Sequence, residues 1–294
     1  MSLKRGLYFS PETPIKKTCV REIDITQEYY EYLTDNEEVL FKSKTDFLND
    51  SKNYENSKQI IKEYYRQILI DWLVKVCLKF DMDNTTLFLC VDIIDRSLDK
   101  LIIKRDNLQL LGCVALLLAA KFLQVRVPYV QALIDISDNA FTKKQFIEME
   151  RKVFEQGLCF KMNGLTSNMF LPWFFKNANS SKKEELLTNY IIELTAMEYS
   201  FVNVKPSLIA SSCLYLARQY TMPKEIWNYK LQTITRYKSE DLKFYVIKLH
   251  VMMLGVWDNH NETIAIREKY DTKKFQNIST IVCMKTDDLC FHFV

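Results

Sequence analysis

The sequence predicts an all-α protein with two tandem five-helix units and a short helix ahead of them. Gly and Pro, which interrupt helices most often, number only 5 and 6 in 294 residues. Residues 108–121 form an apolar stretch without proline, typical of a helix buried on every side. Residues 208–218 repeat the pattern of residues 111–121, which indicates a second copy of the same unit.

Composition excludes several classes of protein. The 40 basic and 37 acidic residues give a net charge of +3, too balanced to indicate a nucleic-acid partner. Eight cysteines without CxxC or metal-ligand spacing predict a reducing, intracellular protein with no metal and no cofactor. Three scattered histidines and no phosphate-binding Gly-rich loop argue against an enzyme. The eleven apolar residues between Gln109 and Lys121 are fewer than the ~20 that cross a bilayer, so no membrane association is expected.

The N-terminal part predicts one short helix. Residues 1–24 read as a flexible tail, and residues 25–61 as a helix followed by a polar connector. Ile25, Tyr29 and Tyr32 recur at helical spacing, so this helix docks either on the main body or on a partner.

The first unit is expected at residues 62–165. Its first helix, at about 60–80, has two apolar stripes, so either it is central or its second face is a binding groove. One stripe comprises Tyr65, Ile68, Leu69, Trp72 and Val76, and the other Ile70, Leu73, Val74, Cys77 and Phe80. Further helices are predicted at 86–98, 105–123, 129–137 and 142–156, the last with a capping box at Thr142 and an end at Gly157.

The second unit is expected at residues 166–257. Ile191-Ile192-Glu193 matches Ile93-Ile94-Asp95, and Ser239 opens a helix as Thr142 does. Both matches come in the same order as the apolar repeat, and nearly the same number of residues separates the two copies in each case. Residues 258–294 are mixed in charge and form a C-terminal tail without predicted structure.

Residues 65–73, Tyr-Arg-Gln-Ile-Leu-Ile-Asp-Trp-Leu, resemble the cyclin box. The resemblance continues at residues 92–96, 108–112, 119–122, 142–150 and 205–207, and it is nearest to the A- and B-type cell-cycle cyclins. It implies two five-helix cyclin boxes and a regulatory subunit, not an enzyme. Such a subunit binds and activates a cyclin-dependent kinase in the nucleus and cytoplasm.

The resemblance also implies kinase-binding residues. Lys121 and Glu150 match the pair that holds the kinase's regulatory helix; taken alone, they suggest a helix-end charge or a plain salt bridge. Further kinase contacts are implied at Phe122, Phe154, Phe160, Ile25, Tyr29 and Tyr32, with core packing as the alternative for the three phenylalanines. Arg66 and Asp95 match a structural pair between the first two helices.

A docking groove for Arg-x-Leu motifs of substrates or inhibitors is implied at Tyr65, Ile68, Leu69, Trp72, Val76, Arg105, Leu108 and Gln109. The chain departs from the family where Tyr65 replaces Met and Lys75 replaces Glu. The ammonium of Lys75 would repel a basic motif that a carboxylate would attract, so the groove's specificity differs from that of the family. A promoter-binding cyclin fold and a non-activating scaffold are the alternatives. The charge balance argues against the first, and the Lys121–Glu150 match against the second.

Overall fold

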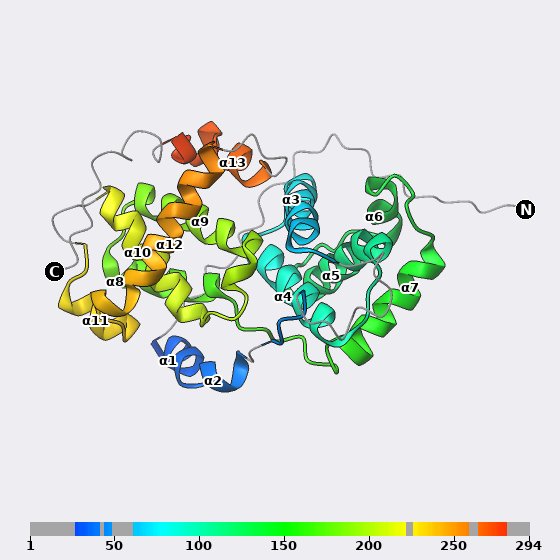
Figure 1. Cartoon of the computed structure of the whole chain (residues 1–294), viewed down its shortest axis with the longest axis horizontal. Helices are drawn as coiled ribbons and strands as arrows, with labels where there is room; N and C mark the ends of the chain where they lie inside the picture. The colour runs from blue at the N-terminus through cyan, green and yellow to red at the C-terminus, as the bar shows by residue number, and fades with distance from the viewer. Residues whose placement is uncertain (1–26, 42–43, 49–60, 222–225, 259–263, 281–294) are drawn as a thin grey trace, which may run out of the picture.

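The computed structural model describes residues 27–41, 44–48, 61–221, 226–258 and 264–280 (Figure 1). Within these ranges the chain forms thirteen α-helices and no strand, which confirms the predicted all-α class. Two sets of five helices lie side by side, with a short helical pair below them and a short helix above them in this view.

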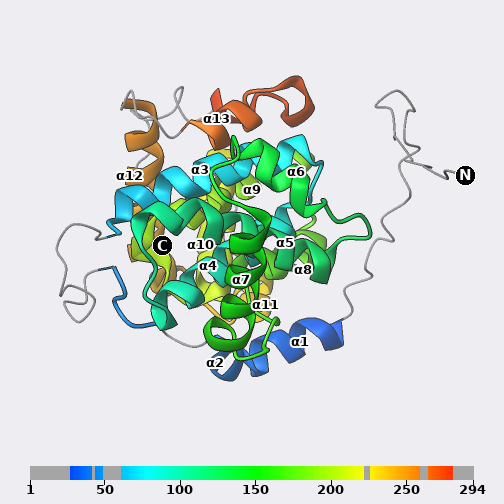
Figure 2. The same cartoon turned by 90° about the vertical axis from the view of Figure 1, so that its right-hand side faces the viewer.

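The first unit is built around α5. Small residues dominate its middle, so neighbouring helices approach its backbone closely, and α4, α7 and α3 pack on it. Figure 2 shows α7 on the outer side of this unit, over α5. The five helices are α3 (Glu63–Lys79), α4 (Asn84–Lys100), α5 (Leu108–Leu123), α6 (Val130–Ile136) and α7 (Lys143–Lys152).

Helix α5 is also strongly apolar, with buried residues at all but four of its positions. Counted from Arg105 to Leu123, it is long and apolar enough to cross a membrane by length and composition. However, 67% of that stretch is buried inside the protein, as in the core helix of a globular domain. The burial follows from packing by α3, α4 and α7 on its different sides.

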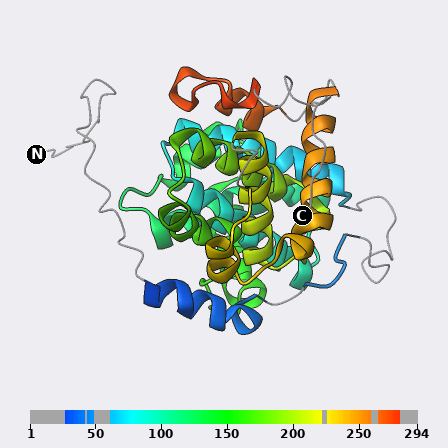
Figure 3. The ribbon, with the colours of Figure 1, turned by 90° about the vertical axis from the view of Figure 1, so that its left-hand side faces the viewer.

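The second unit repeats this arrangement around α10. Helices α9 and α12 pack on α10 as α4 and α7 pack on α5, which confirms the predicted repeat. Figure 3 shows α12 along one edge of the second unit. Its helices are α8 (Leu171–Ala178), α9 (Lys182–Met197), α10 (Pro206–Thr221), α11 (Tyr229–Thr235) and α12 (Ser239–Asp258).

The capping box of α7 forms as predicted, with Thr142 and Gln145 bonded to each other's backbone N–H groups. Gly157 differs from the expectation, because it ends a π-helical turn, Val153–Gly157, without a left-handed cap. A Cβ at Gly157 would lie 3.1 Å from Oγ of Ser97, so the glycine permits close packing on α4. Cys159 and Phe160 take the left-handed backbone instead, with φ of 47° and 61°.

The predicted N-terminal helix is a pair, α1 (Gln27–Asp35) and α2 (Glu37–Leu40), that docks on the second unit. Tyr30 stacks on Trp173 and donates a 2.5 Å hydrogen bond from its hydroxyl to the carbonyl of Ile234. The carboxylate of Glu37 accepts hydrogen bonds from the backbone N–H and hydroxyl of Ser207, at the start of α10. Anionic caps of this kind stabilise a helix N-terminus.

Helix α13 (Ala265–Tyr270) lies in the C-terminal region, for which the sequence predicts no structure. It packs on α3 of the first unit and α9 of the second. The ammonium of Lys269 lies 2.8 Å from both carboxylate oxygens of the fully buried Glu193 and 2.7 Å from Oδ1 of Asn84. Figures 1 and 3 place α13 and the α1–α2 pair on opposite sides of the molecule.

Candidate partner-binding surfaces

The last turn of α5 places Lys121 against α7. Its ammonium lies 2.5 Å from Oε1 of Glu150, so the structure brings the predicted pair together. The Lys121 side chain is 51% exposed and that of Glu150 is 22% exposed. A pair this open contributes little to stability, and both side chains are within reach of a partner.

Three phenylalanines predicted as kinase contacts lie on the segments that carry this ion pair or follow them. Phe122, next to Lys121, is 55% exposed, and Phe160 is 66% exposed. The rings of Phe154 and Phe160 meet edge to face, 5.1 Å between centroids. Phe122 and Phe160 are thus mostly exposed and lie outside the core, whereas Phe154 is half-buried and packs against the core. We call Lys121, Glu150, Phe122, Phe154 and Phe160 the ion-pair surface.

Sequence reasoning missed exposed apolar side chains beside the ion-pair surface. Leu123 and Val125 follow Phe122 along the chain, and Ile147 lies one turn before Glu150 on α7. The sequence does carry a signal for Ile147, because its spacing of three residues from Glu150 puts both side chains on the same side of α7.

The N-terminal helices present two of the three predicted contacts. Tyr29 and Tyr32 are exposed on α1, whereas Tyr30 and Leu33 form its buried face. Ile25 lies outside the described residues. Both alternatives thus apply to one helix, because Tyr30 and Leu33 pack on the body while Tyr29 and Tyr32 stay accessible to a partner.

The predicted groove residues divide into an accessible set and a buried set. Leu69, Val76 and Leu108 are buried, whereas Tyr65, Ile68, Trp72 and Gln109 remain partly exposed and Arg105 is exposed. The other stripe of α3 is core, since Ile70, Leu73, Val74 and Cys77 are buried and Phe80 is partly buried. One stripe of this helix thus packs inward while part of the other reaches solvent.

We call Tyr65, Ile68 and Trp72 the α3 face. Leu69 lies below them in space left by Gly112 of α5, where a Cβ would come within 2.8 Å of Cδ1 of Leu69. Arg105 covers one end of the face, because its guanidinium lies over the Tyr65 ring and donates a 3.1 Å hydrogen bond to the Tyr65 hydroxyl.

Lys75 lies one turn beyond Trp72 on α3. Its ammonium is 3.2 Å from Oδ2 of Asp71, while Oδ1 of Asp71 accepts a 2.7 Å hydrogen bond from the backbone N–H of Ala265. The positive charge at this end of the α3 face therefore has a nearby counter-ion, which weakens its repulsion of a basic partner.

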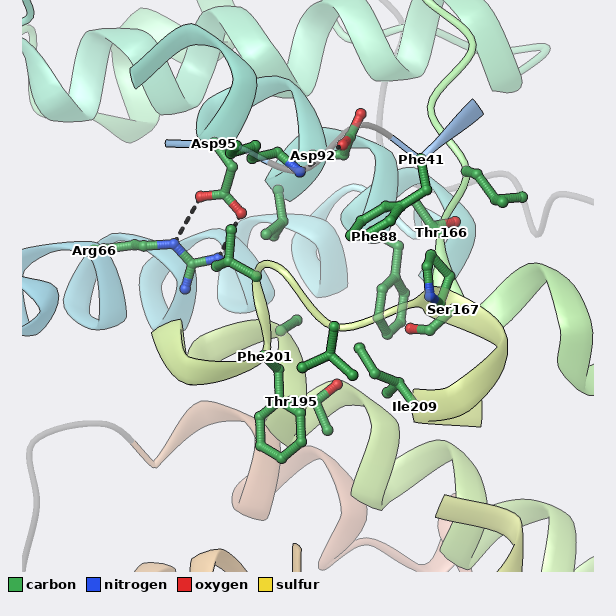
Figure 4. Close-up of a pocket in the computed structure, with 17 residues that line it drawn as sticks. Phe41, Arg66, Phe88, Asp92, Asp95, Thr166, Ser167, Thr195, Phe201 and Ile209 are labelled. Atoms are coloured by element: carbon green, nitrogen blue, oxygen red, sulfur yellow. Dashed lines mark hydrogen bonds and ion pairs between the residues drawn. The ribbon is translucent and has the colours of Figure 1, made fainter. Parts of the chain in front are cut away.

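Arg66 and Asp95 form a buried two-pronged ion pair between α3 and α4 (Figure 4). The third guanidinium nitrogen of Arg66 donates a 3.1 Å hydrogen bond to the carbonyl of Met197, in the second unit. The pair borders a cavity of about 80 Å³ between the two units, whose walls include Phe88 and Ile209. This geometry fits a structural role, because buried charges need partners.

Metal and thiol chemistry find little support in the described part of the chain. No three His, Cys, Asp or Glu side chains there gather as metal ligands would. Cys77 and Cys113 are free, and burial raises the pKa of each thiol to about 12. A thiol with so high a pKa stays protonated at neutral pH and is a poor nucleophile.

Each of the two five-helix units matches a known family model. The family model for the cyclin N-terminal domain matches residues 28–163, and the one for the cyclin C-terminal domain matches residues 165–284. The chain belongs to the cyclin family. The match to the cyclin C-terminal domain includes α13, for which the sequence predicted no structure.

Individual cyclins agree with this assignment. The chain is 36% identical over 257 residues to Cyclin-B2-1 of Oryza sativa subsp. japonica, covering 86% of this chain and 57% of that one. It is 35% identical to the G2/mitotic-specific cyclin-2 of Medicago sativa, covering 76% and 68%. The chain thus spans roughly half to two thirds of the length of such relatives. A viral cyclin from herpesvirus saimiri shares the fold, with a TM-score of 0.63 at 19% identity over 76% of this chain and 95% of that one.

Proposed function

We propose that this cyclin is a regulatory subunit that binds and activates a cyclin-dependent kinase in cell-cycle control. The exposed Lys121–Glu150 pair, with its aromatic neighbours, is the observation that carries the proposal. Similarity to Cyclin-B2-1 supports a kinase partner. The nucleus and cytoplasm, expected from the sequence resemblance, are the locations we propose. The cyclin itself supplies no catalytic residue.

Activation follows from differential binding. The ion-pair surface contacts the kinase's regulatory helix and holds it inward, which aligns the Lys–Glu ion pair of the kinase and moves its activation loop off the site. The cyclin shifts the kinase toward this state only by as much as it binds the active conformation more tightly. Phe122 and Phe160 contribute apolar area that becomes buried in the complex.

Replacement of both charges tests the kinase interface. Lys121→Ala with Glu150→Ala should abolish co-purification with the kinase and leave helix content unchanged. The matched control is Lys144→Ala with Glu148→Ala, a more exposed pair on the same helix as Glu150. If the first double variant still binds and activates the kinase normally, the assignment of this surface is wrong.

The α3 face supports a second part of the proposal, the recruitment of substrates or inhibitors with Arg-x-Leu motifs. The leucine would pack on the exposed apolar side chains, and the Gln109 amide would bond an extended peptide. Trp72→Ala should leave phosphorylation of a simple peptide unchanged but slow that of an Arg-x-Leu protein. Equal loss on both substrates would assign Trp72 to the core alone.

A further inference from the structure

Helix α12 presents a row of exposed apolar side chains. Phe244, Ile247 and Val251 recur at i, i+3 and i+7, so they form one stripe along the helix. They are 67%, 39% and 60% exposed, and the Phe244 ring meets that of Tyr245 edge to face. One turn beyond Val251 the same side of the helix continues at Gly255, where a Cβ would meet no atom within 4 Å. We call Phe244, Ile247 and Val251 the α12 stripe.

The last helix of the first unit shows what a side that meets only water carries. Helix α7 is the fifth helix of its unit, as α12 is of the second. Exposed positions on α7 hold the ion pair of Lys144 with Glu148, and Arg151 pairs with Glu155 one turn further on. Charged residues are usual on the solvent side of a helix, whereas contiguous exposed apolar side chains mark interaction sites. The α12 stripe therefore indicates a binding surface.

The α12 stripe is separate from the residues proposed to hold the kinase. Figure 1 shows α7 at one end of the molecule and α12 in the other unit, and Figure 2 places α12 and α1 toward opposite corners. The predicted kinase contacts lie on α5 and α7, at Lys121 and Glu150, and on α1, at Tyr29 and Tyr32. We expect a kinase held at these residues to leave the α12 stripe accessible to a third protein.

The charges beside the stripe indicate the chemistry of that partner. Lys243 lies on one side of the stripe and Lys248 on the other. Lys243 is exposed, and the half-buried Lys248 holds its ammonium over the Phe201 ring. A helix with carboxylates on both flanks of an apolar side would cover the stripe and oppose both ammoniums, as charged flanks do in paired helices. Glu240, at the N-terminal end of the stripe, favours a basic residue at the matching end of that helix.

A second copy of this chain fits the stripe less well. Three side chains, none with more than about 250 Å² of surface, fall short of the about 800 Å² that a stable dimer buries on each partner. Antiparallel pairing of two stripes, with Phe244 against Val251 of the other copy, would also bring the two Lys248 side chains close together. Like charges at that distance repel. Both area and charge therefore favour a partner of different sequence.

We propose that the α12 stripe binds an acidic amphipathic helix of a third protein while the kinase is bound elsewhere on the cyclin. This site is additional to the proposed kinase interface and does not depend on which residues hold the kinase. Burial of the three apolar side chains supplies affinity, and the two lysines select for carboxylates. A single helix buries little area, so the association is transient.

The test uses a fluorescein-labelled synthetic peptide of 20 residues, the length of α12, with leucines along one side of the helix and glutamates on both flanks. Fluorescence anisotropy follows its binding to the full chain. Phe244→Ser with Val251→Ser should weaken binding about tenfold or more, because apolar contact is lost, and should leave kinase activation unchanged. The matched control, Val39→Ser with Ile102→Ser, removes two exposed apolar side chains elsewhere and should bind as the wild type does. Equal binding to the wild type and the first variant would place the peptide elsewhere and overturn the proposal.

A charge reversal separates specific docking from misfolding. Lys243→Glu with Lys248→Glu should weaken binding of the glutamate-flanked peptide about fivefold and tighten that of a lysine-flanked version by a similar factor. A misfolded variant cannot show both changes. If the wild type binds the two peptides equally, the lysines select nothing and an acidic partner is excluded.

Three further outcomes would assign the stripe to another occupant and overturn the proposal. Loss of peptide binding on saturation with the kinase would mean that the kinase covers it. A dimer of the wild type in sedimentation velocity, absent in Phe244→Ser with Val251→Ser, would assign it to a second copy. Peptide binding at least tenfold tighter to a chain ending after residue 280 would assign it to the chain's own last residues.

Discussion

At the scale of single residues, the buried Glu193 shows how the second unit depends on a distant segment. Its carboxylate has no solvent exposure and is bonded by Lys269, Tyr270 and Asn84. Burial, and next to it the same carboxylate, raise the pKa of Tyr270 well above its usual value, so the phenol remains a donor. Removing the cationic partner of such a buried carboxylate leaves an unpaired charge in the interior, which destabilises the folded protein.

Replacing Lys269 by methionine should therefore be costly. Lys269→Met leaves Glu193 buried without a cation, and we expect a loss of about 3–5 kcal/mol in the free energy of unfolding. Urea denaturation measures it, with Lys273→Met, an exposed lysine of the same segment, as the control. Adding Glu193→Gln should recover part of the loss. An unchanged urea midpoint in Lys269→Met would show that Glu193 finds another partner.

His250 predicts a pH dependence of stability. It is buried on α12, its Nδ1 lies 2.9 Å from the hydroxyl of Tyr220, and burial lowers its pKa. The unfolded chain, with a histidine pKa of about 6.5, then binds a proton more readily than the folded one as pH falls below that value. Stability contributed by neutral His250 is thus present above pH 6.5 and lost below it.

The measurement compares the melting temperature of wild type and His250→Asn between pH 7.5 and 5.5. Asparagine keeps a polar group near the Tyr220 hydroxyl but does not titrate. The wild type should lose more stability on acidification than the variant does. His260 and His292, which lie outside the described residues, are present in both proteins and cancel. If the melting temperatures of the two proteins fall equally between pH 7.5 and 5.5, His250 is not the source of the pH dependence.

At the scale of elements, local periodicity predicted α3 and its two stripes, because a long amphipathic helix carries its pattern in neighbouring residues. The same reasoning could not find α13. This helix has only six residues, and its partners Asp71, Asn84 and Glu193 lie far away in the sequence. The ion-pair surface was predictable through family motifs, whereas Ile147 beside it matched no motif.

Helix α3 also predicts how charge tunes the α3 face. Lys75→Glu places a carboxylate one turn from Trp72, where it attracts a basic motif. We expect about threefold tighter binding of an Arg-x-Leu peptide, the size typical of an exposed ion pair. The gain should shrink at high salt. Lys79→Glu makes the same charge change further along the helix and should have little effect. Equal gains in both variants would indicate a general charge effect.

At the scale of the whole molecule, two segments outside the helical units hold them together. The backbone N–H of Thr45 donates to Asp99 of α4, while Lys44 and Asn203 of the second unit exchange two hydrogen bonds. On another part of the surface, α13 bonds Asp71 of the first unit and Glu193 of the second. These segments, which belong to neither five-helix set, therefore add to the direct bonds between the units, such as that from Arg66 to Met197.

This arrangement matters for partner binding, because the predicted kinase contacts are split between the units. Lys121 and Glu150 belong to the first, whereas Tyr29 and Tyr32 lie on α1, which docks on the second. A rigid partner gains both sets of contacts only when the two units keep one relative orientation. Freedom between the units adds an ordering cost to association.

Ending the chain after residue 263 should therefore weaken kinase binding, although none of the predicted contact residues is removed. We expect at least about a tenfold loss of affinity, about 1.4 kcal/mol, from the added ordering cost. Calorimetry should show the single unfolding transition broaden or split as the units uncouple. A chain ending after residue 280 keeps α13 and its bonds to both units, so its affinity should match that of the full chain. If the shorter chain unfolds in two transitions yet binds the kinase with unchanged affinity, the kinase contacts only one unit, and the contacts predicted at Tyr29 and Tyr32 are wrong.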